Sequence, residues 1–182
     1  TFLYGPGANI HRSPYSGRNF EYYSEDGFLS SEIGRYEVKG IEEKGVRVVM
    51  KHFALNDCEQ DRIGLGVWLN EQAAREIYLR AFQGALEDSQ GSGNGVMMAY
   101  TRWGAQWSGA NEKLVRGILN EEWNCNGLQI TDNVLNSMVN GIQGVLGGTT
   151  TYDSMLAFMI TGKGGLAGYE NDPVAVSAMR EA

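Results

Sequence analysis

The chain has 182 residues, and 42% of them are hydrophobic. A domain of this size buries roughly 70% of the surface that its unfolded chain exposes, so a globular protein with a real core is expected. The formal net charge of -7 comes without a basic stripe or arm, which excludes nucleic acid as a partner and favours a small neutral or cationic ligand. No apolar run reaches the roughly 20 residues of a membrane span and no signal peptide is recognisable, so we expect no membrane partner, and the compartment stays open.

The two cysteines, Cys58 and Cys125, are too few for a disulfide scaffold. Their spacing also matches no zinc-binding pattern. We therefore predict two free thiols, and we expect neither a metal ion nor a cofactor.

Three segments share one layout, in which a glycine precedes a short run of Val, Ile, Leu or Met and polar residues follow. They are "GVRVVMKHF" (45–53), "GVMMAYTRW" (95–103) and "GLQITDN" (127–133). Continuous apolar runs of this kind suit parallel strands that are buried on both faces. Helical spacing between them predicts helices over 26–44, 70–88 and 111–123, the second with an Asn cap. The alternation indicates an α/β protein built from crossover units.

The last part of the chain is harder to interpret. Residues 136–147 have a helix-like start that ends at a Gly-Gly break, and the apolar run 155–160 fits a strand or a helix equally well. Asp172 as a cap and Pro173 at the first helical position predict one more helix. Residues 89–95, "SQGSGNG", predict a surface loop.

All three predicted strands end in reactive side chains. Lys51 and His52 follow the first apolar run, Tyr100 and Arg102 the second, and Asp132 the third. Ligands of parallel α/β folds bind beyond the carboxyl ends of the strands, so these residues are expected on one rim. Asp132 then suits a nucleophile, a general base, a metal ligand or the N-cap of a following helix. Lys51 suits a Schiff base, a donor to hydroxyls or an ion pair.

Four stretches resemble the catalytic barrel of glycoside hydrolase family 3, the family of β-glucosidases and related exo-acting enzymes. They are "GPGANIHRSPYSGRNFEYYSED" (5–26), "KHFALNDCEQDR" (51–62), "MMAYTRWGAQWSGAN" (97–111) and "GLQITDN" (127–133). The resemblance implies that residues 1–182 are a single segment of a (β/α)8 TIM-type barrel, hence a partial barrel. It further implies that the early strands and the second domain lie outside this sequence.

What the resemblance implies for the site is specific. Asp132 matches the family's catalytic nucleophile, Arg18, Lys51 and His52 match residues that bind the sugar, and Tyr100 matches a tyrosine near the nucleophile. We expect a retaining β-glucosidase type that releases terminal β-D-glucose through a glycosyl-enzyme on Asp132. Positive neighbours are expected to lower the pKa of Asp132.

Two features depart from the family pattern. Asn133 stands where an aromatic residue commonly follows the nucleophile, and no acid/base residue is identifiable in the sequence. The alternative function is therefore a catalytically incomplete carbohydrate-binding or assembly module, and a weaker one is an aldolase-like barrel that uses Lys51. Open strand edges predict a homo-oligomer or a partner chain that completes the barrel.

Overall fold

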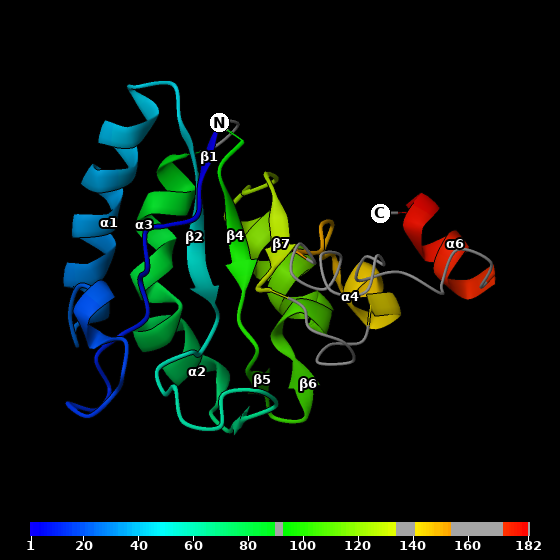
Figure 1. Ribbon diagram of the computed structural model, residues 1–182, viewed down its shortest axis with the longest axis horizontal. Helices are drawn as coiled ribbons and strands as arrows, with labels where there is room; N and C mark the ends of the chain where they lie inside the picture. Colours follow the sequence, from blue (N-terminus) through cyan, green and yellow to red (C-terminus); the bar gives the residue numbers. More distant parts are fainter. Residues whose placement is uncertain (90–92, 134–140, 154–172, 182) are drawn as a thin grey trace.

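The computed structural model describes residues 1–89, 93–133, 141–153 and 173–181. Its centre is a parallel sheet in the order β1-β2-β4-β7, formed by β1 (Phe2–Leu3), β2 (Arg47–Phe53), β4 (Gly95–Met98) and β7 (Gln129–Thr131). Each neighbouring pair is parallel, so all carboxyl ends lie at one edge, the lower edge in Figure 1. This sheet with its crossover helices confirms the predicted α/β class.

The helices begin close to where capping residues predict them. α1 (Gly27–Glu42) starts after Asp26, whose Oδ1 accepts from the Leu29 N–H at 2.6 Å. The next helical stretch consists of three consecutive elements: α2 (Glu71–Ala73), the π-helical η2 (Ala74–Tyr78) and α3 (Arg80–Asp88). It is capped by Asn70, whose Oδ1 accepts from the Ala73 N–H at 2.8 Å. η4 (Lys113–Glu122), also π-helical, follows Asn111, whose side chain accepts from the Leu114 N–H. Short polar side chains at these positions satisfy N–H groups that the helix cannot.

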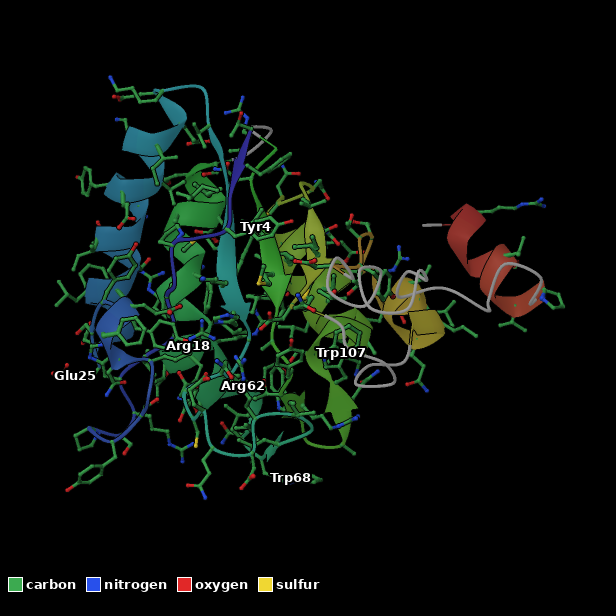
Figure 2. The ribbon with its side chains drawn as sticks, in the orientation of Figure 1. Tyr4, Arg18, Glu25, Arg62, Trp68 and Trp107 are labelled. Carbon is green, nitrogen blue, oxygen red and sulfur yellow. The ribbon has the colours of Figure 1, made fainter. Side chains whose placement is uncertain are left out.

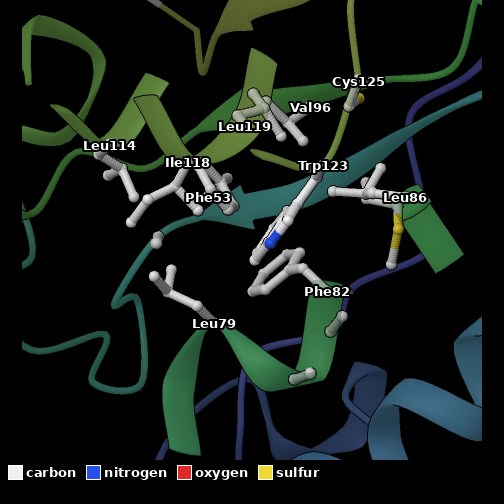
Figure 3. Close-up of a cluster of buried hydrophobic side chains, with 14 of the residues drawn as sticks. Phe53, Leu79, Phe82, Leu86, Val96, Leu114, Ile118, Leu119, Trp123 and Cys125 are labelled. Carbon is white, nitrogen blue, oxygen red and sulfur yellow. The ribbon is translucent and has the colours of Figure 1, made fainter. Parts of the chain in front are cut away.

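Both faces of the central sheet are buried, as the continuous apolar strands predict. On one face, Phe53 of β2 packs edge-on against Phe82 and Trp123, with ring centroids 5.4 and 6.1 Å apart (Figure 3). The residues on the other face are Val49, Met97 and Ile130. Along β4, Val96 and Met98 enter the first cluster and Met97 the second, because side chains along a strand alternate in direction. Phe53 joins the first cluster although Val49 lies in the second, because the register of β2 against β4 shifts between Lys51 and Phe53.

A second, small sheet was not predicted. β3 (Gly66–Val67) pairs in parallel with β5 (Arg102–Trp103), and β5 pairs antiparallel with β6 (Gln106–Trp107). Consequently the predicted strand 95–103 ends early: β4 stops at Met98, and 102–103 join the small sheet. A 3-10 turn, η3 (Ser108–Ala110), leads from it towards η4, and another, η1 (Asn19–Glu21), lies in the first long loop.

The remaining elements are helices. α4 (Gly141–Gly147) ends at the predicted glycine break, where Gly148 has a positive φ of 110°. α6 (Pro173–Glu181) begins at Pro173 as predicted, whereas its proposed cap Asp172 and the run 155–160 lie outside the described residues. Within the described part of the chain, no helix has both the length and the apolarity to cross a membrane.

Candidate active site

Asp132 lies directly beyond β7 at the carboxyl edge of the sheet. Its backbone N–H donates to the Met98 carbonyl at 3.2 Å, which fixes the turn against β4. Its Oδ1 accepts from the Asn133 N–H at 2.7 Å, and its Oδ2 points towards His52. One carboxylate oxygen is therefore held by the backbone, while the other faces β2, which lies on the far side of β4.

Lys51 and His52 lie inside β2 and not beyond its end. The apolar run stops at Met50, but the hydrogen-bonded strand continues to Phe53. Pairing of Phe53 with Met98 of β4 extends the strand. On the other side of β2, Asn9 Oδ1 accepts from the His52 N–H at 2.8 Å and Asn9 Nδ2 donates to the His52 carbonyl at 3.0 Å. A side-chain amide thus takes the place of a neighbouring strand.

His52 and Asp132 face each other across the site. The distance from His52 Nε2 to Asp132 Oδ2 is 3.7 Å, too long for a hydrogen bond but short enough for one atom of a substrate to contact both groups. Burial, reinforced by the charges of Arg18, Lys51 and Arg62, lowers the pKa of His52 to about 2. His52 is therefore neutral near pH 7 and does not form an ion pair with Asp132.

Arg62 is a site residue that the sequence analysis missed. Its Nη1 lies 3.7 Å from Asp132 Oδ2, and its guanidinium stacks 4.9 Å from the centroid of the Tyr100 ring. The Tyr100 hydroxyl in turn donates to the carbonyl of Asn133. Arg62 closes the segment 51–62 that carries the family resemblance, and its place at the end of that segment was the available signal.

Six charged side chains form one chain of alternating sign at this edge. Glu21 links the first two cations, because its carboxylate lies 3.8 Å from Lys51 Nζ and 3.2 Å from the Arg18 guanidinium. Glu59 links the next two, because its carboxylate lies 3.9 Å from Arg18 and 3.5 Å from Arg62. Arg62 then reaches Asp132. Figure 2 shows Arg18 and Arg62 together at the carboxyl edge of the sheet. Because each cation has an acidic neighbour, the chain holds these donors in place at little net charge.

The pKa of Asp132 shifts in the direction opposite to the one that the sequence analysis predicts. We expected its positive neighbours to lower it, but burial raises the pKa of Asp132 above its ordinary value. The Asn133 N–H bond and the charges of Arg62, Arg18 and Lys51 oppose this effect without overcoming it. Removal of a carboxylate from water favours its neutral form, and at Asp132 this effect outweighs the neighbouring positive charges.

The structure thus brings His52, Arg62 and Tyr100 to Asp132, and it links Lys51 and Arg18 to them through Glu21 and Glu59. Arg102, which also followed a predicted strand, instead lies in β5 and donates to the Ala105 carbonyl. Carboxylate, neutral imidazole and guanidinium groups side by side can bind hydroxyl groups and present one oxygen nucleophile.

Comparison with known proteins gives a consistent result. Residues 1–149 match the model of the glycosyl hydrolase family 3 N-terminal domain. A thermostable β-glucosidase B from Acetivibrio thermocellus is 38% identical over 143 residues, which are 78% of this chain and 19% of that protein. A β-glucosidase from Bacteroides ovatus is 42% identical over 130 residues, 71% of this chain and 17% of that protein.

Solved structures agree with the sequence matches. β-Glucosidase 3B from Thermotoga neapolitana in complex with glucose superposes with a TM-score of 0.81 and 33% identity, covering 98% of this chain and 26% of that one. The β-glucosidase from Kluyveromyces marxianus in complex with glucose gives a TM-score of 0.76 and 30% identity, covering 83% of this chain and 18% of that one. The chain therefore spans about a quarter or less of the length of these relatives.

Proposed function

This chain belongs to glycosyl hydrolase family 3, within the family's N-terminal domain, and we propose that its carboxyl edge is the sugar-binding half of a retaining β-glucosidase site. The relatives are named β-glucosidases, and two of their structures are titled as complexes with glucose. In the proposed reaction, Asp132 attacks the anomeric carbon of a terminal β-glucosyl residue. The bond to the leaving oxygen breaks as that oxygen takes up a proton from a general acid. Water then attacks the glucosyl-enzyme, which frees the sugar and the Asp132 carboxylate and returns a proton to that acid.

The observation that carries this proposal is the position of Asp132 Oδ2. Asn133 N–H occupies the other carboxylate oxygen, so Oδ2 is the atom left to attack carbon. The donors His52 and Arg62 both lie 3.7 Å from it, so one sugar hydroxyl placed beside each pair can hydrogen-bond to the donor and to Oδ2 together. Arg62 Nη1 is buried and has no hydrogen-bond partner among the described residues, so a hydroxyl oxygen would satisfy it.

The remaining site residues have roles in binding. Lys51 and Arg18 extend the row of donors along the edge, and we assign both to sugar hydroxyls together with His52. The ion pair of Lys51 with Glu21 suits a charged donor better than the neutral amine of a Schiff base. Tyr100 supports Arg62 by stacking and anchors the turn after Asp132 through the Asn133 carbonyl.

Covalent labelling tests the role of Asp132. An activated 2-fluoro-glucoside has a leaving group that departs as an anion, so it needs little help from a general acid. We expect slow formation of a glucosyl adduct on Asp132, detected by mass spectrometry of the intact chain and mapped by peptide analysis. Asp132→Asn should abolish the adduct, whereas Asp153→Asn is the matched control and should retain it.

The alternative, a carbohydrate-binding module without turnover, predicts a different result. Arg18, Lys51 and His52 would still bind glucose, but no adduct would form. Glucose binding without labelling, or an adduct mapped to another residue, would therefore refute the nucleophile role of Asp132.

A further inference from the structure

A buried chain of hydrogen bonds leads from Glu59 to His52. Glu59 Oε1 accepts from Asn56 Nδ2 at 2.8 Å, and the same Nδ2 lies 3.2 Å from the Tyr22 hydroxyl. That hydroxyl lies 3.2 Å from His52 Nδ1. Tyr22, His52 and Asn56 are 5%, 2% and 1% exposed, so water has little access to any of their polar atoms.

The direction of each hydrogen bond follows from what each group can donate. Glu59 is ion-paired with Arg18 and Arg62, so its carboxylate only accepts, and the amide of Asn56 must present its NH2 group to it. The second proton of that NH2 points to the Tyr22 oxygen, which therefore accepts. The opposite amide orientation would place two oxygens 2.8 Å apart.

Tyr22 then has one proton left to donate. Among the described residues, the only other recorded hydrogen-bond partner of its hydroxyl is His52 Nδ1. If Nδ1 carried a proton, two donors would compete for the Tyr22 oxygen, and the hydroxyl proton would be buried without an acceptor, which costs free energy. Nδ1 must accept, so the single proton of the neutral imidazole is on Nε2.

We propose that Tyr22, oriented by Asn56 and Glu59, is a positioning residue that holds His52 in the Nε2–H tautomer, with this N–H directed at Asp132. A neutral N–H donor 3.7 Å from Oδ2 can bind a hydroxyl oxygen beside the carboxylate without adding charge. The other tautomer would direct a lone pair at the carboxylate, so the two groups would repel each other. This functional consequence rests on the proposed sugar site, but the tautomer itself does not.

Nitrogen NMR of histidine-labelled chain reads the tautomer directly, because protonated and unprotonated ring nitrogens resonate far apart. His11 is the other histidine, and His11→Gln assigns its signals. In the wild-type chain near neutral pH we expect His52 as a neutral ring with its proton on Nε2. An imidazolium, or a proton on Nδ1, would overturn the proposal.

Asn56→Asp provides the sharpest test. The substituted carboxyl lies against Glu59, so the two acids share one proton between them, and towards Tyr22 the new oxygen can only accept. The Tyr22 hydroxyl should therefore turn towards it, and Nδ1 of His52 should become the donor to the Tyr22 oxygen. We therefore expect the tautomer to change from Nε2–H to Nδ1–H. A folded Asn56→Asp chain that keeps the wild-type tautomer would refute the hydrogen-bond order. A purely structural role of Asn56 predicts no such reversal.

Tyr22→Phe and its matched control complete the experiment. Removal of the Tyr22 hydroxyl should lower the fraction of the Nε2–H tautomer, whereas Tyr23→Phe, which removes a hydroxyl bonded to Glu37 on α1, should leave it unchanged. Glucose affinity, measured by titration, should fall about three- to tenfold in Tyr22→Phe only, the effect of one lost hydrogen bond. An unchanged tautomer in Tyr22→Phe overturns the proposal. A wild-type chain that binds no glucose counts against the sugar site instead, and the NMR result still decides the tautomer.

Discussion

At the scale of single residues, burial decides the charge state of the groups near the site. His52 is neutral because it is buried among three cations, and Asp132 has a raised pKa although the same cations lie near it. Asp57 is a third case: it is 5% exposed, its Oδ1 accepts from the Ile10 N–H at 3.0 Å, and burial raises its pKa to about 7. In each of the three groups, burial shifts the pKa in the direction that favours the neutral form.

The raised pKa of Asp57 predicts a pH-dependent stability. Between about pH 4 and pH 7 the folded chain keeps the proton on Asp57 while the unfolded chain releases it, so rising pH favours unfolding across this window. Asp57→Asn removes this effect and keeps an oxygen that can accept from Ile10. We expect the free energy of unfolding of the variant, relative to wild type, to increase from about pH 5 to about pH 8 in urea titrations. His52, whose contribution runs the other way, is common to both proteins and cancels.

A constant difference between the two proteins across that range would contradict this prediction. It would mean that the Ile10 N–H and the charge of Arg12, which both lower the pKa of Asp57, compensate its burial completely.

At the scale of elements, α1 and α3 pack on the same face of the sheet through a close contact at Gly84. Its N–H donates to Ser31 Oγ at 3.0 Å, and a Cβ built on Gly84 would lie 2.4 Å from that oxygen. Gly40, in the same helix pair, has no atom within 4 Å of its would-be Cβ. Gly84 therefore allows α1 and α3 to approach each other closely, whereas the contacts of Gly40 give no reason for a glycine at that position.

Alanine substitutions should separate these two glycines. Gly84→Ala is expected to lower the free energy of unfolding by about 1–3 kcal/mol, since the helices must move apart. Gly40→Ala should raise it by about 0.5–1 kcal/mol, since alanine favours the helix and nothing obstructs its methyl group. Thermal or urea unfolding measures both. Equal effects of the two substitutions would show that helix propensity, and not the α1–α3 contact, dominates at Gly84.

At the scale of the whole molecule, the described central sheet has four strands, and β1 is an outer strand of this sheet. Among the described strands, β1 pairs only with β2. Phe2 and Leu3 of β1 and the following Tyr4 are between 44% and 50% exposed. An exposed apolar edge with free backbone groups pairs readily with another chain.

We therefore expect the 182-residue chain to self-associate or to bind a partner polypeptide along β1. Leu3→Lys adds a charge to that edge and should shift the chain towards monomer in light scattering. Leu146→Lys, an equally exposed change on α4, should not. A monodisperse wild-type monomer, or an equal effect of both substitutions, would argue against the edge as the contact.

The sequence by itself determined the order of the three strands β2, β4 and β7 and of the helices between them, the helix starts and the carboxyl-edge position of Asp132. These follow from apolar runs, capping residues and spacing, which act over a few neighbouring residues. The resemblance in residues 5–26 and 51–62 further predicted the family, which the comparisons confirm. The roles of Arg18, Lys51, His52, Tyr100 and Asp132 stay predictions until the labelling and binding experiments are done.

Only the tertiary structure decided the small β3-β5-β6 sheet, the inclusion of Arg62 in the site, the sign of the pKa shift of Asp132 and the tautomer of His52. Each depends on groups that are distant in sequence: Arg62 meets Asp132 across 70 positions, and Tyr22 meets His52 across 30. Local sequence sets which atoms can donate or ionise. Burial and the distances between segments, which the fold alone establishes, determine which of them do.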